Sequence, residues 1–300
     1  MLTIHITVVP IQYVNGDLSK EIGNIYFKGD VIVKGNVLDE MIIHATGNIE
    51  ITGSAYHSEI IASCSVLIHG KAIGCKIHSG ADKSKLYLAI PALQEISQYI
   101  LEMFQKIKSN DTNYPQDKLM IIHNYNKRIE NEIKSINTIT DFMEKGDNIN
   151  INNLMKRLKN SLMQILLLKD IGFKNLLSIY NEMIELIQVV QTSVDEDVCL
   201  SLSYAQGCDL NSCGNIILTG KGSYQTNMVA QNEITYSAPM SVVRGGTIIA
   251  GSKIVAGIIG TPGEIHTECR VLQADGVVKG SFYRGSIVYI NNMMQDIVTI

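Results

Sequence analysis

A short pattern recurs along two stretches of this chain and constrains its fold more than any other feature. It reads Gly, then Asn, Asp, Ser or Thr, then alternating β-branched residues, then Gly. The clearest repeats start at Gly23, Gly29, Gly47, Gly214, Gly246 and Gly285. In the first stretch the repeats start at positions 29, 47, 64 and 80, a period of 16 to 18 residues. Short strands at a fixed period, separated by Gly or Asn, are typical of a stack of β-coils, that is, a solenoid.

The alternating residues of each repeat predict one buried face per strand. Ile49 and Ile51 point to the same side, as do Val66 and Ile68, because successive side chains of a strand alternate. The Gly and Asn residues between strands are expected at corners, where they tolerate a positive φ angle. The predicted structural corners are Gly29, Gly35, Gly47, Gly53, Gly214, Gly220, Arg244, Gly245, Gly246 and Gly251.

The pattern changes abruptly over residues 90–197, which we expect to form a helical, coiled-coil-like insertion. Glycine occurs there only at Gly146 and Gly172, and apolar residues recur at helical spacing. Helix breaks are expected at 110–117, at 146–150 and at Gly172. The four predicted apolar stripes are Leu93, Ile96, Ile100, Met103 and Ile107; Leu119, Ile122, Ile129, Ile133, Ile136, Ile139 and Met143; Leu154, Leu158, Leu162, Ile165 and Leu168; and Leu176, Tyr180, Met183, Ile187, Val190 and Val194.

These segments predict one interrupted solenoid rather than two repeat domains. Residues 1–89 are its first part, and residues 198–300 are its second part with a C-terminal cap. Neighbouring strands lie about 4.8 Å apart, so the helical insertion must return to where it left, which requires an even number of antiparallel passes. The expected fold is therefore mostly β with an α insertion: a right-handed parallel β-helix interrupted by an antiparallel α-helical hairpin or bundle. The strand edges at its ends need covers, for which residues 2–9 and 293–300 are candidates.

Bulk composition excludes several classes of function. The net charge of −4 and the pI near 6.0 argue against a nucleic-acid partner. No apolar run is long enough to span a membrane, and the N-terminal residues do not resemble a signal peptide. Six cysteines in 300 residues are too few for a disulfide framework. We therefore expect reduced thiols and a cytoplasmic location.

The two β segments resemble the β-helix region of the bacterial flagellar assembly protein A (FapA) family. The order of the matching segments carries the resemblance, since Gly-Asn-Ile repeats also occur in other β-solenoids. The matching stretches, in the family's order, are 14–17, 22–25, 29–37, 45–51, 243–251, 260–263 with Thr267, and 276–290.

This resemblance implies a flagellar context, a helical insertion in mid-solenoid and no defined set of catalytic residues. Members of the family usually carry a further domain ahead of the repeats. This chain starts almost directly at the β-helix, so we expect it to lack that domain. Cys64 and the pair Gln231 and Asn232 replace corner glycines, which indicates a divergent member.

Two patterns have a superficial likeness to binding motifs. Residues 214–223 resemble a phosphate-binding loop, but their Gly-x5-Gly-Lys spacing is one residue too long, and Gly222 stands where the motif needs Ser or Thr. Cys199, Cys208 and Cys213 suggest a metal site, but a tetrahedral site needs a fourth ligand, and cysteine is often a buried apolar residue. We predict a strand for the first and a structural role for the second.

The remaining candidates also favour structure over chemistry. His44, His57, His69 and His78 do not follow the coil period, and His266-Thr267-Glu268 lacks the cysteine motif of a zinc deaminase. The acidic run 195–197 is expected to be a solvated hinge rather than half of a glycosidase site. Arg244 is expected to bond to carbonyl groups at a corner. No catalytic, cofactor-binding or metal residue is predicted.

The leading hypothesis is a non-enzymatic scaffold that binds protein partners through its helical insertion, because apolar-striped helices suit helix-in-groove or coiled-coil contacts. The sequence does not decide between a monomer and a homo-oligomer. One alternative is a bactofilin-like, polymer-forming β-helix that stacks end to end. A hexapeptide-repeat acyltransferase and a sugar-active β-helix enzyme are less favoured, since the apolar residues do not recur every six positions and charged residues are sparse.

Overall fold

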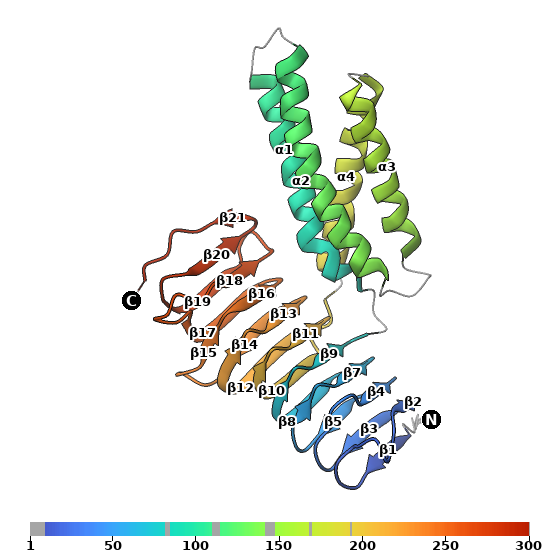
Figure 1. The fold of residues 1–300 in the computed structure, drawn as a ribbon, viewed down its shortest axis with the longest axis vertical. Coiled ribbons are helices and arrows are strands. Elements are labelled where there is room, and N and C mark those ends of the chain that lie inside the picture. The colour runs from blue at the N-terminus through green and yellow to red at the C-terminus, as the bar shows by residue number, and fades with distance from the viewer. Residues whose placement is uncertain are drawn as a thin grey trace, which may run out of the picture. The chain divides into compact units, whose positions relative to one another are not determined.

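The computed structural model describes residues 10–81, 85–109, 115–141, 148–167, 170–192 and 194–299. The chain divides into two compact units, a β unit made of residues 1–83 and 194–300 and a helical unit made of residues 84–193 (Figure 1). The insertion expected at residues 90–197 thus corresponds to a unit that begins slightly earlier and ends slightly earlier. Each unit has its own core.

The β unit is a solenoid of two stacked sheets. One sheet holds β1 (Ile11–Val14), β3 (Asp30–Val33), β5 (Ile49–Ile51), β6 (Ala55–Tyr56), β8 (Val66–Ile73), β10 (Cys199–Gln206), β12 (Asn215–Tyr224), β14 (Glu233–Tyr236), β15 (Val242–Arg244), β17 (Lys253–Ile259) and β19 (Val277–Phe282). The other holds β2 (Ile25–Phe27), β4 (Ile42–Ala45), β7 (Glu59–Ala62), β9 (Lys76–Ser79), β11 (Asp209–Ser212), β13 (Asn227–Ala230), β16 (Gly246–Ala250), β18 (Thr267–Val271), β20 (Ser286–Ile290) and β21 (Met293–Met294). Among the described residues every strand pair is parallel except β20 with β21.

The solenoid continues directly across the inserted helical unit. Strand β8, which precedes the insertion, pairs with β10, which follows it, and β9 pairs with β11 in the same way. The register places Val66 beside Leu200 and Ile77 beside Leu210. The two halves of the repeat therefore belong to one array.

The core of the β unit lies between the two sheets. Ile49, Ile51, Val66 and Ile68 are all buried, as the alternating pattern predicts. A third side of the early coils consists of short bridges from Leu18 to Val37 and on to Ala55, whose side chains are also fully buried. The inward residues of successive coils stack on one another and form a single apolar cluster along the whole unit.

The C-terminal segment pairs with the last strands of the solenoid. Strand β21 pairs antiparallel with β20, and Thr299 bridges Phe282 of β19. The side chain of Ile297 packs against the core, whereas Met293 and Met294 are exposed. The predicted N-terminal cover, residues 2–9, lies outside the described residues, as does Ile300.

The helical unit contains a short 3-10 helix η1 (Lys85–Ala89) and four α-helices: α1 (Ile90–Ser109), α2 (Pro115–Asp141), α3 (Asn148–Leu166) and α4 (Asp170–Thr192). Pro115 is the first residue of α2, where its missing N–H costs no hydrogen bond. The predicted break at Gly172 is wrong, because Gly172 lies inside the first turn of α4. A methyl group there would lie 2.9 Å from the backbone nitrogen of Ile165, so this glycine permits close packing against α3.

Candidate functional site

The helical unit has a closed arrangement in which α1 contacts α2, α2 contacts α3, α3 contacts α4 and α4 contacts α1. Its core contains most of the described residues of the predicted apolar stripes, together with others such as Tyr125, Ile151 and Ile179. The residues of those stripes that are buried are Leu93, Ile96, Ile100, Met103, Ile122, Ile129, Ile133, Ile136, Leu154, Leu158, Leu162, Ile165, Leu176, Met183, Ile187 and Val190. Ile139, Met143 and Leu168 are not among the residues whose side chains the structure describes. Burying one stripe per helix leaves the other faces available for contacts outside the unit.

Helices α1 and α2 are joined by a polar and aromatic cluster. The guanidinium of Arg128 lies 4.4 Å from the ring centre of Tyr99 and 5.9 Å from that of Tyr125. The Tyr125 hydroxyl donates to Oε2 of Glu102 at 3.1 Å. Burial, and next the charge of Glu95, raises the pKa of Tyr99 to about 12. Cation–π contacts of this kind contribute about 0.5–1 kcal/mol each at exposed sites, so the cluster stabilises the α1–α2 pair.

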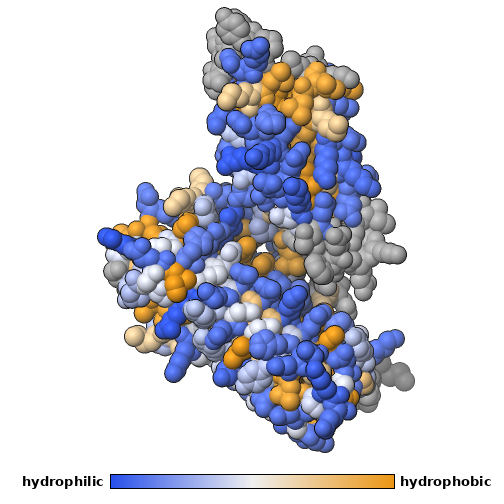
Figure 2. Space-filling view, viewed as in Figure 1, coloured by the Kyte–Doolittle hydropathy of each residue, from blue (hydrophilic) through white to orange (hydrophobic). Residues whose placement is uncertain are grey.

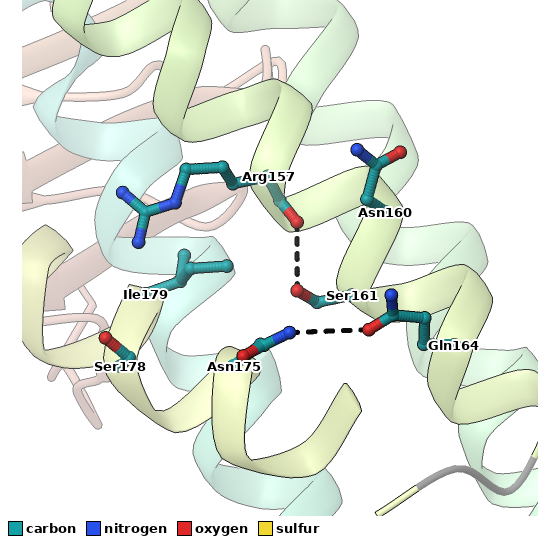
Figure 3. Close-up of a pocket in the computed structure, with 7 residues that line it drawn as sticks. All are labelled: Arg157, Asn160, Ser161, Gln164, Asn175, Ser178 and Ile179. Carbon is teal, nitrogen blue, oxygen red and sulfur yellow. Dashed lines mark hydrogen bonds between the residues drawn. The ribbon is translucent and has the colours of Figure 1, made fainter. Parts of the chain in front are cut away.

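A polar groove of about 310 Å³ lies between α3 and α4 (Figure 3). Its lining residues are Arg157, Asn160, Ser161, Gln164, Asn175, Ser178 and Ile179. Arg157 is paired with Glu182 at 2.7 Å, and the amide of Asn175 donates to Gln164 at 3.4 Å. The Ser161 hydroxyl donates to the carbonyl oxygen of Arg157 at 2.9 Å. Two of these contacts, Arg157 with Glu182 and Asn175 with Gln164, thus join α3 to α4, whereas the Ser161 bond lies within α3.

The helical unit also exposes large apolar side chains. Four of them lie around the α3–α4 turn and form what we name the α3–α4 patch: Met163, Leu166, Leu167 and Ile171. Met163, Leu167 and Ile171 are 65%, 67% and 58% exposed. Figure 2 shows hydrophobic residues gathered on the visible surface of this unit. Apolar side chains that cluster on a surface mark an interaction site more often than scattered ones do.

The predicted corner glycines fall into two groups. Gly29, Gly245 and Gly246 have positive φ angles of 145°, 77° and 94°, as expected of corners. The prediction of a positive φ is wrong for the other six, namely Gly35, Gly47, Gly53, Gly214, Gly220 and Gly251. Each of these six approaches the backbone of the adjacent coil so closely that a Cβ atom would not fit.

Gly35, Gly53 and Gly70 stack on successive coils, and Gly220 continues the series beyond Ser203; we name these four residues the glycine column. A methyl group on Gly53 would lie 2.6 Å from the carbonyl oxygen of Gly35, and one on Gly70 would lie 2.5 Å from that of Gly53. Gly220 approaches the carbonyl oxygen of Ser203 in the same way, at 2.5 Å. These glycines are required by the spacing of the coils, because only glycine permits such backbone contact.

The corner Asn, Asp and Ser residues also act between coils rather than by adopting a positive φ. Oδ1 of Asp17 accepts from the backbone N–H of Asn36 at 2.7 Å, and Oδ1 of Asn36 accepts from that of Ser54 at 2.9 Å. Oγ of Ser54 accepts from the N–H of Lys71 at 3.1 Å. A second series begins with Asp30, which accepts from the N–H of Asn48 at 2.6 Å. These side chains satisfy backbone groups that the corners would otherwise leave unpaired.

The other sequence candidates lie apart from one another. Arg244 is exposed at the end of β15 and makes no side-chain hydrogen bond to a described residue, so the expected contact with corner carbonyls is not found. Residues 215–224 form strand β12, which runs through the pattern that resembled a phosphate loop. In the acidic run, Asp195 accepts from the N–H of Asp197 at 3.1 Å and so forms part of a turn. The described residues contain no group of three or more His, Cys, Asp or Glu placed to hold a metal ion.

The four early histidines each lie beside a residue of an adjacent coil. Nδ1 of His57 is 3.2 Å from Asp39, and Nε2 of His69 is 2.8 Å from Glu50. His78 lies 3.4 Å from the amide of Asn211. His44 stacks edge-on against Tyr26, with ring centres 5.0 Å apart. His266 is exposed.

The sequence interpretation missed one pair of residues, Cys75 and Cys208. Both are buried, and the backbone N–H of Cys75 points to Sγ of Cys208 at 3.4 Å. The sequence predicts a structural role for Cys208 together with Cys199 and Cys213, and it predicts nothing for Cys75. Superposing the coils by their period would have found the pair, because Ser58, Cys75, Cys208 and Thr226 are equivalent positions of four successive coils.

The coil geometry and the continuity across the insertion agree with a comparison to protein families. Residues 10–110 match the flagellar assembly protein A (FapA) beta solenoid domain. The resemblance seen in the sequence is therefore confirmed over this stretch, which runs from β1 through α1. No curated protein and no solved structure matches the chain. None of the described helices is long and apolar enough to cross a membrane.

Proposed function

We propose that this chain is a non-enzymatic scaffold that acts in bacterial flagellar assembly or its regulation, and that the helical unit binds its protein partners. The single observation that carries the proposal is the match of residues 10–110 to the FapA beta solenoid domain. The α3–α4 patch supports the second part, because Leu167, directly after the end of α3, and Ile171, in the first turn of α4, both expose apolar side chains. The free cysteines are consistent with action in the reducing cytoplasm.

Two finer points of the architecture belong to the same proposal. We infer a right-handed solenoid, since connections between parallel strands of one sheet are right-handed in about 98% of cases. We also infer an antiparallel bundle. Arg157 contacts Glu182 and Gln164 contacts Asn175, so the contacts descend along α4 as they ascend along α3.

The ends of the solenoid bear on the polymer-forming alternative. A bactofilin-like filament requires an open strand edge at each end of the coil stack. Here β21 occupies the outer edge of β20, and Thr299 bridges β19. This arrangement favours a discrete species over end-to-end stacking. Sedimentation at rising protein concentration tests the point, since filaments would contradict the scaffold proposal.

The structure indicates where the helical unit can be removed. In uninterrupted coils two residues separate the positions equivalent to Ser79 and Cys199, namely Ala62 and Ser65 in one coil and Ser212 and Asn215 in another. Deleting residues 81–197 joins Gly80 directly to Val198 and leaves the same two-residue connection between Ser79 and Cys199. Because β8 already pairs with β10 and β9 with β11, the shortened chain should keep the β unit folded.

The test compares three strains of the organism that encodes the chain: the parent, a complete knockout and the 81–197 deletion. Swimming motility and the number of flagella per cell are scored. We expect both mutant strains to lose motility. In the deletion strain the shortened protein should still be produced, and circular dichroism of the purified protein should show that it is folded. A knockout that swims normally overturns the flagellar role. A deletion strain that swims normally overturns only the role of the helical unit.

A finer test addresses the α3–α4 patch itself. A double variant, Leu167→Gln with Ile171→Gln, changes two exposed side chains and should leave the folding of the unit intact. The matched control is Met293→Gln with Met294→Gln, which changes two equally exposed residues of the C-terminal cover. We expect the first pair to reduce motility and the second to leave it unchanged. Equal effects of the two pairs would argue against the patch.

A further inference from the structure

Cys75 and Cys208 occupy the same position in the two coils on either side of the helical unit. The strand registers fix this equivalence, because Ile73 lies beside Gln206 and Lys76 lies beside Asp209. The corner between those registered residues therefore places Cys75 beside Cys208. Parallel strands are spaced about 4.8 Å apart, which lies within the Cα separation of about 4.4–6.8 Å found in disulfides.

The two side chains also share one orientation. The sulfur atom of each residue lies 3.3 Å from the carbonyl oxygen two residues before it, that of Ile73 for Cys75 and that of Gln206 for Cys208. The backbone N–H of Cys75 lies 3.4 Å from Sγ of Cys208, so this sulfur is directed toward the neighbouring coil. Both residues belong to the apolar core and are 1% and 2% exposed. The two sulfur atoms are therefore held as neighbours away from solvent.

The pair does not ionise as two independent thiols. A hydrogen bond from Cys208 lowers the pKa of Cys75, while that same hydrogen bond, followed by burial, raises the pKa of Cys208. One sulfur thus favours the thiolate while its neighbour keeps its proton. This asymmetry suits stepwise thiol–disulfide exchange, in which a thiolate attacks first.

We propose that Cys75 and Cys208 form a redox-responsive clasp that joins the coil before the helical unit to the coil after it. The Cys75 thiolate attacks a small disulfide such as glutathione disulfide, giving a mixed disulfide and one released glutathione. Cys208 then loses its proton and attacks the Cys75 sulfur, and the second glutathione leaves. Two protein thiols are oxidised, and one glutathione disulfide is reduced to two glutathione molecules. The new bond closes a covalent loop that contains the whole helical unit.

The neighbouring coils show which substitutions the position accepts. Ser58 precedes Cys75 and contacts its sulfur at 3.4 Å. Thr226 follows Cys208, and its hydroxyl donates to the carbonyl oxygen of Tyr224 in the same pattern at 3.0 Å. Cys75→Ser and Cys208→Thr therefore repeat side chains that the solenoid already holds at this position. Cys269→Ser serves as the control, because Cys269 is also buried in the core but lies in a distant coil.

The experiment uses the full chain in glutathione buffers of increasing oxidised fraction, with urea well below the unfolding transition to speed opening of the corner. Samples are held until the free-thiol count is constant, and oxidised samples are then returned to reduced glutathione. Free thiols are counted after denaturation, and non-reducing peptide mapping identifies any link. Circular dichroism confirms that each variant is folded.

We expect the wild-type count to fall from six thiols to four, with a reversible link between the peptides of Cys75 and Cys208. The Cys269→Ser variant should also lose two thiols, whereas Cys75→Ser and Cys208→Thr should form no internal link. The oxidised wild type should unfold at a higher urea concentration, because the link restricts the unfolded chain. A wild-type chain that keeps all six thiols at the most oxidising ratio, or that links other cysteines, overturns the proposal.

Discussion

Substituting Gly53 with alanine tests whether the glycine column is required by the spacing of the coils. Gly53 does not have a positive φ, so its backbone conformation alone gives no reason to prefer glycine. Where a glycine can be replaced without strain, alanine stabilises a protein by about 0.4–1 kcal/mol, because it restricts the unfolded chain. At Gly53, the close contact with the adjacent coil predicts that alanine destabilises the protein instead.

The magnitude follows from the distances. A methyl group on Gly53 would lie 2.6 Å from the carbonyl oxygen of Gly35, against an ordinary contact of about 3.4 Å or more, so the coils must separate locally by about 0.8 Å. Such overpacking costs about 1–3 kcal/mol. The separation also weakens the hydrogen bond from the Gly53 N–H to that oxygen, now 2.9 Å long, at a cost of about 1 kcal/mol. We expect a total near 3 kcal/mol.

Hydrogen–deuterium exchange measures the local loss of stability in the Gly53→Ala variant. The exchange is read by mass spectrometry on peptides that contain β3 and β5. A loss of about 3 kcal/mol in opening free energy speeds exchange of those amides by about a hundredfold. Gly207 provides the matched control. Its φ is 60°, and a methyl group on it would have no other side chain or backbone within 4 Å, so only its conformation opposes alanine, at about 1–2 kcal/mol.

Comparing alanine with asparagine at each position separates the effect of backbone conformation from the effect of coil contact. At Gly207, asparagine should be tolerated better than alanine, because asparagine adopts the left-handed conformation more readily. At Gly53, asparagine should be at least as harmful as alanine, because it is larger. Unchanged or slower exchange in Gly53→Ala would refute the reasoning that coil contact selects the glycine column.

Of three further predictions, one concerns a hydrogen bond between coils and two concern residues within the helical unit. Asn36→Ala removes the acceptor of the Ser54 N–H and should lower the unfolding free energy by about 1–2 kcal/mol. Asn36→Ser should leave the unfolding free energy nearly unchanged, because Ser54 has the same role one coil later. Urea unfolding of both variants measures these free energies. The pKa of Tyr99 is raised to about 12, so its contribution to stability is complete below pH 10 and is lost as the pH rises toward 12. Ultraviolet titration of the wild type should show one tyrosine that ionises in this late range, and the Tyr99→Phe variant should lack it. Arg128→Gln removes both cation–π contacts and should cost about 1–2 kcal/mol of stability in total. The melting temperature of the helical signal in circular dichroism should therefore fall. An unchanged melting temperature would contradict the stabilising role of the cluster.

Much of the fold follows from residue periodicity. The pairs Ile49 with Ile51 and Val66 with Ile68 are buried because a period of two directs both members of a pair inward. The helical stripes are buried for the corresponding reason at a period of 3.6. The repeat on both sides of the insertion also predicts that the chain returns to the coil that it left. The pairing of β8 with β10 agrees with this prediction.

Other features depend on contacts between coils, which a reading along the chain does not reveal. Gly35 and Gly53 resemble corner residues in sequence, yet their importance lies in the backbone of the coil beside them. Cys75 and Cys208 are far apart in sequence because the helical unit separates them, so their equivalence is visible only once the coils are superposed. The sequence predicts a helix break at Gly172 because glycine is a breaker signal, whereas Gly172 lies within α4 and packs closely against α3.

The direct pairing of β9 with β11 has a consequence for the order of folding. The coils before the insertion can form as soon as that part of the chain has been synthesised, but the β9–β11 pair must wait for the entire helical unit to emerge. Closing an unstructured loop costs entropy that grows with its length. Because η1, which precedes α1, contacts α4 within the helical unit, folding of this unit first would bring its two chain ends close together. The helical unit would then speed completion of the solenoid, and helices that fold slowly would delay every coil after β9.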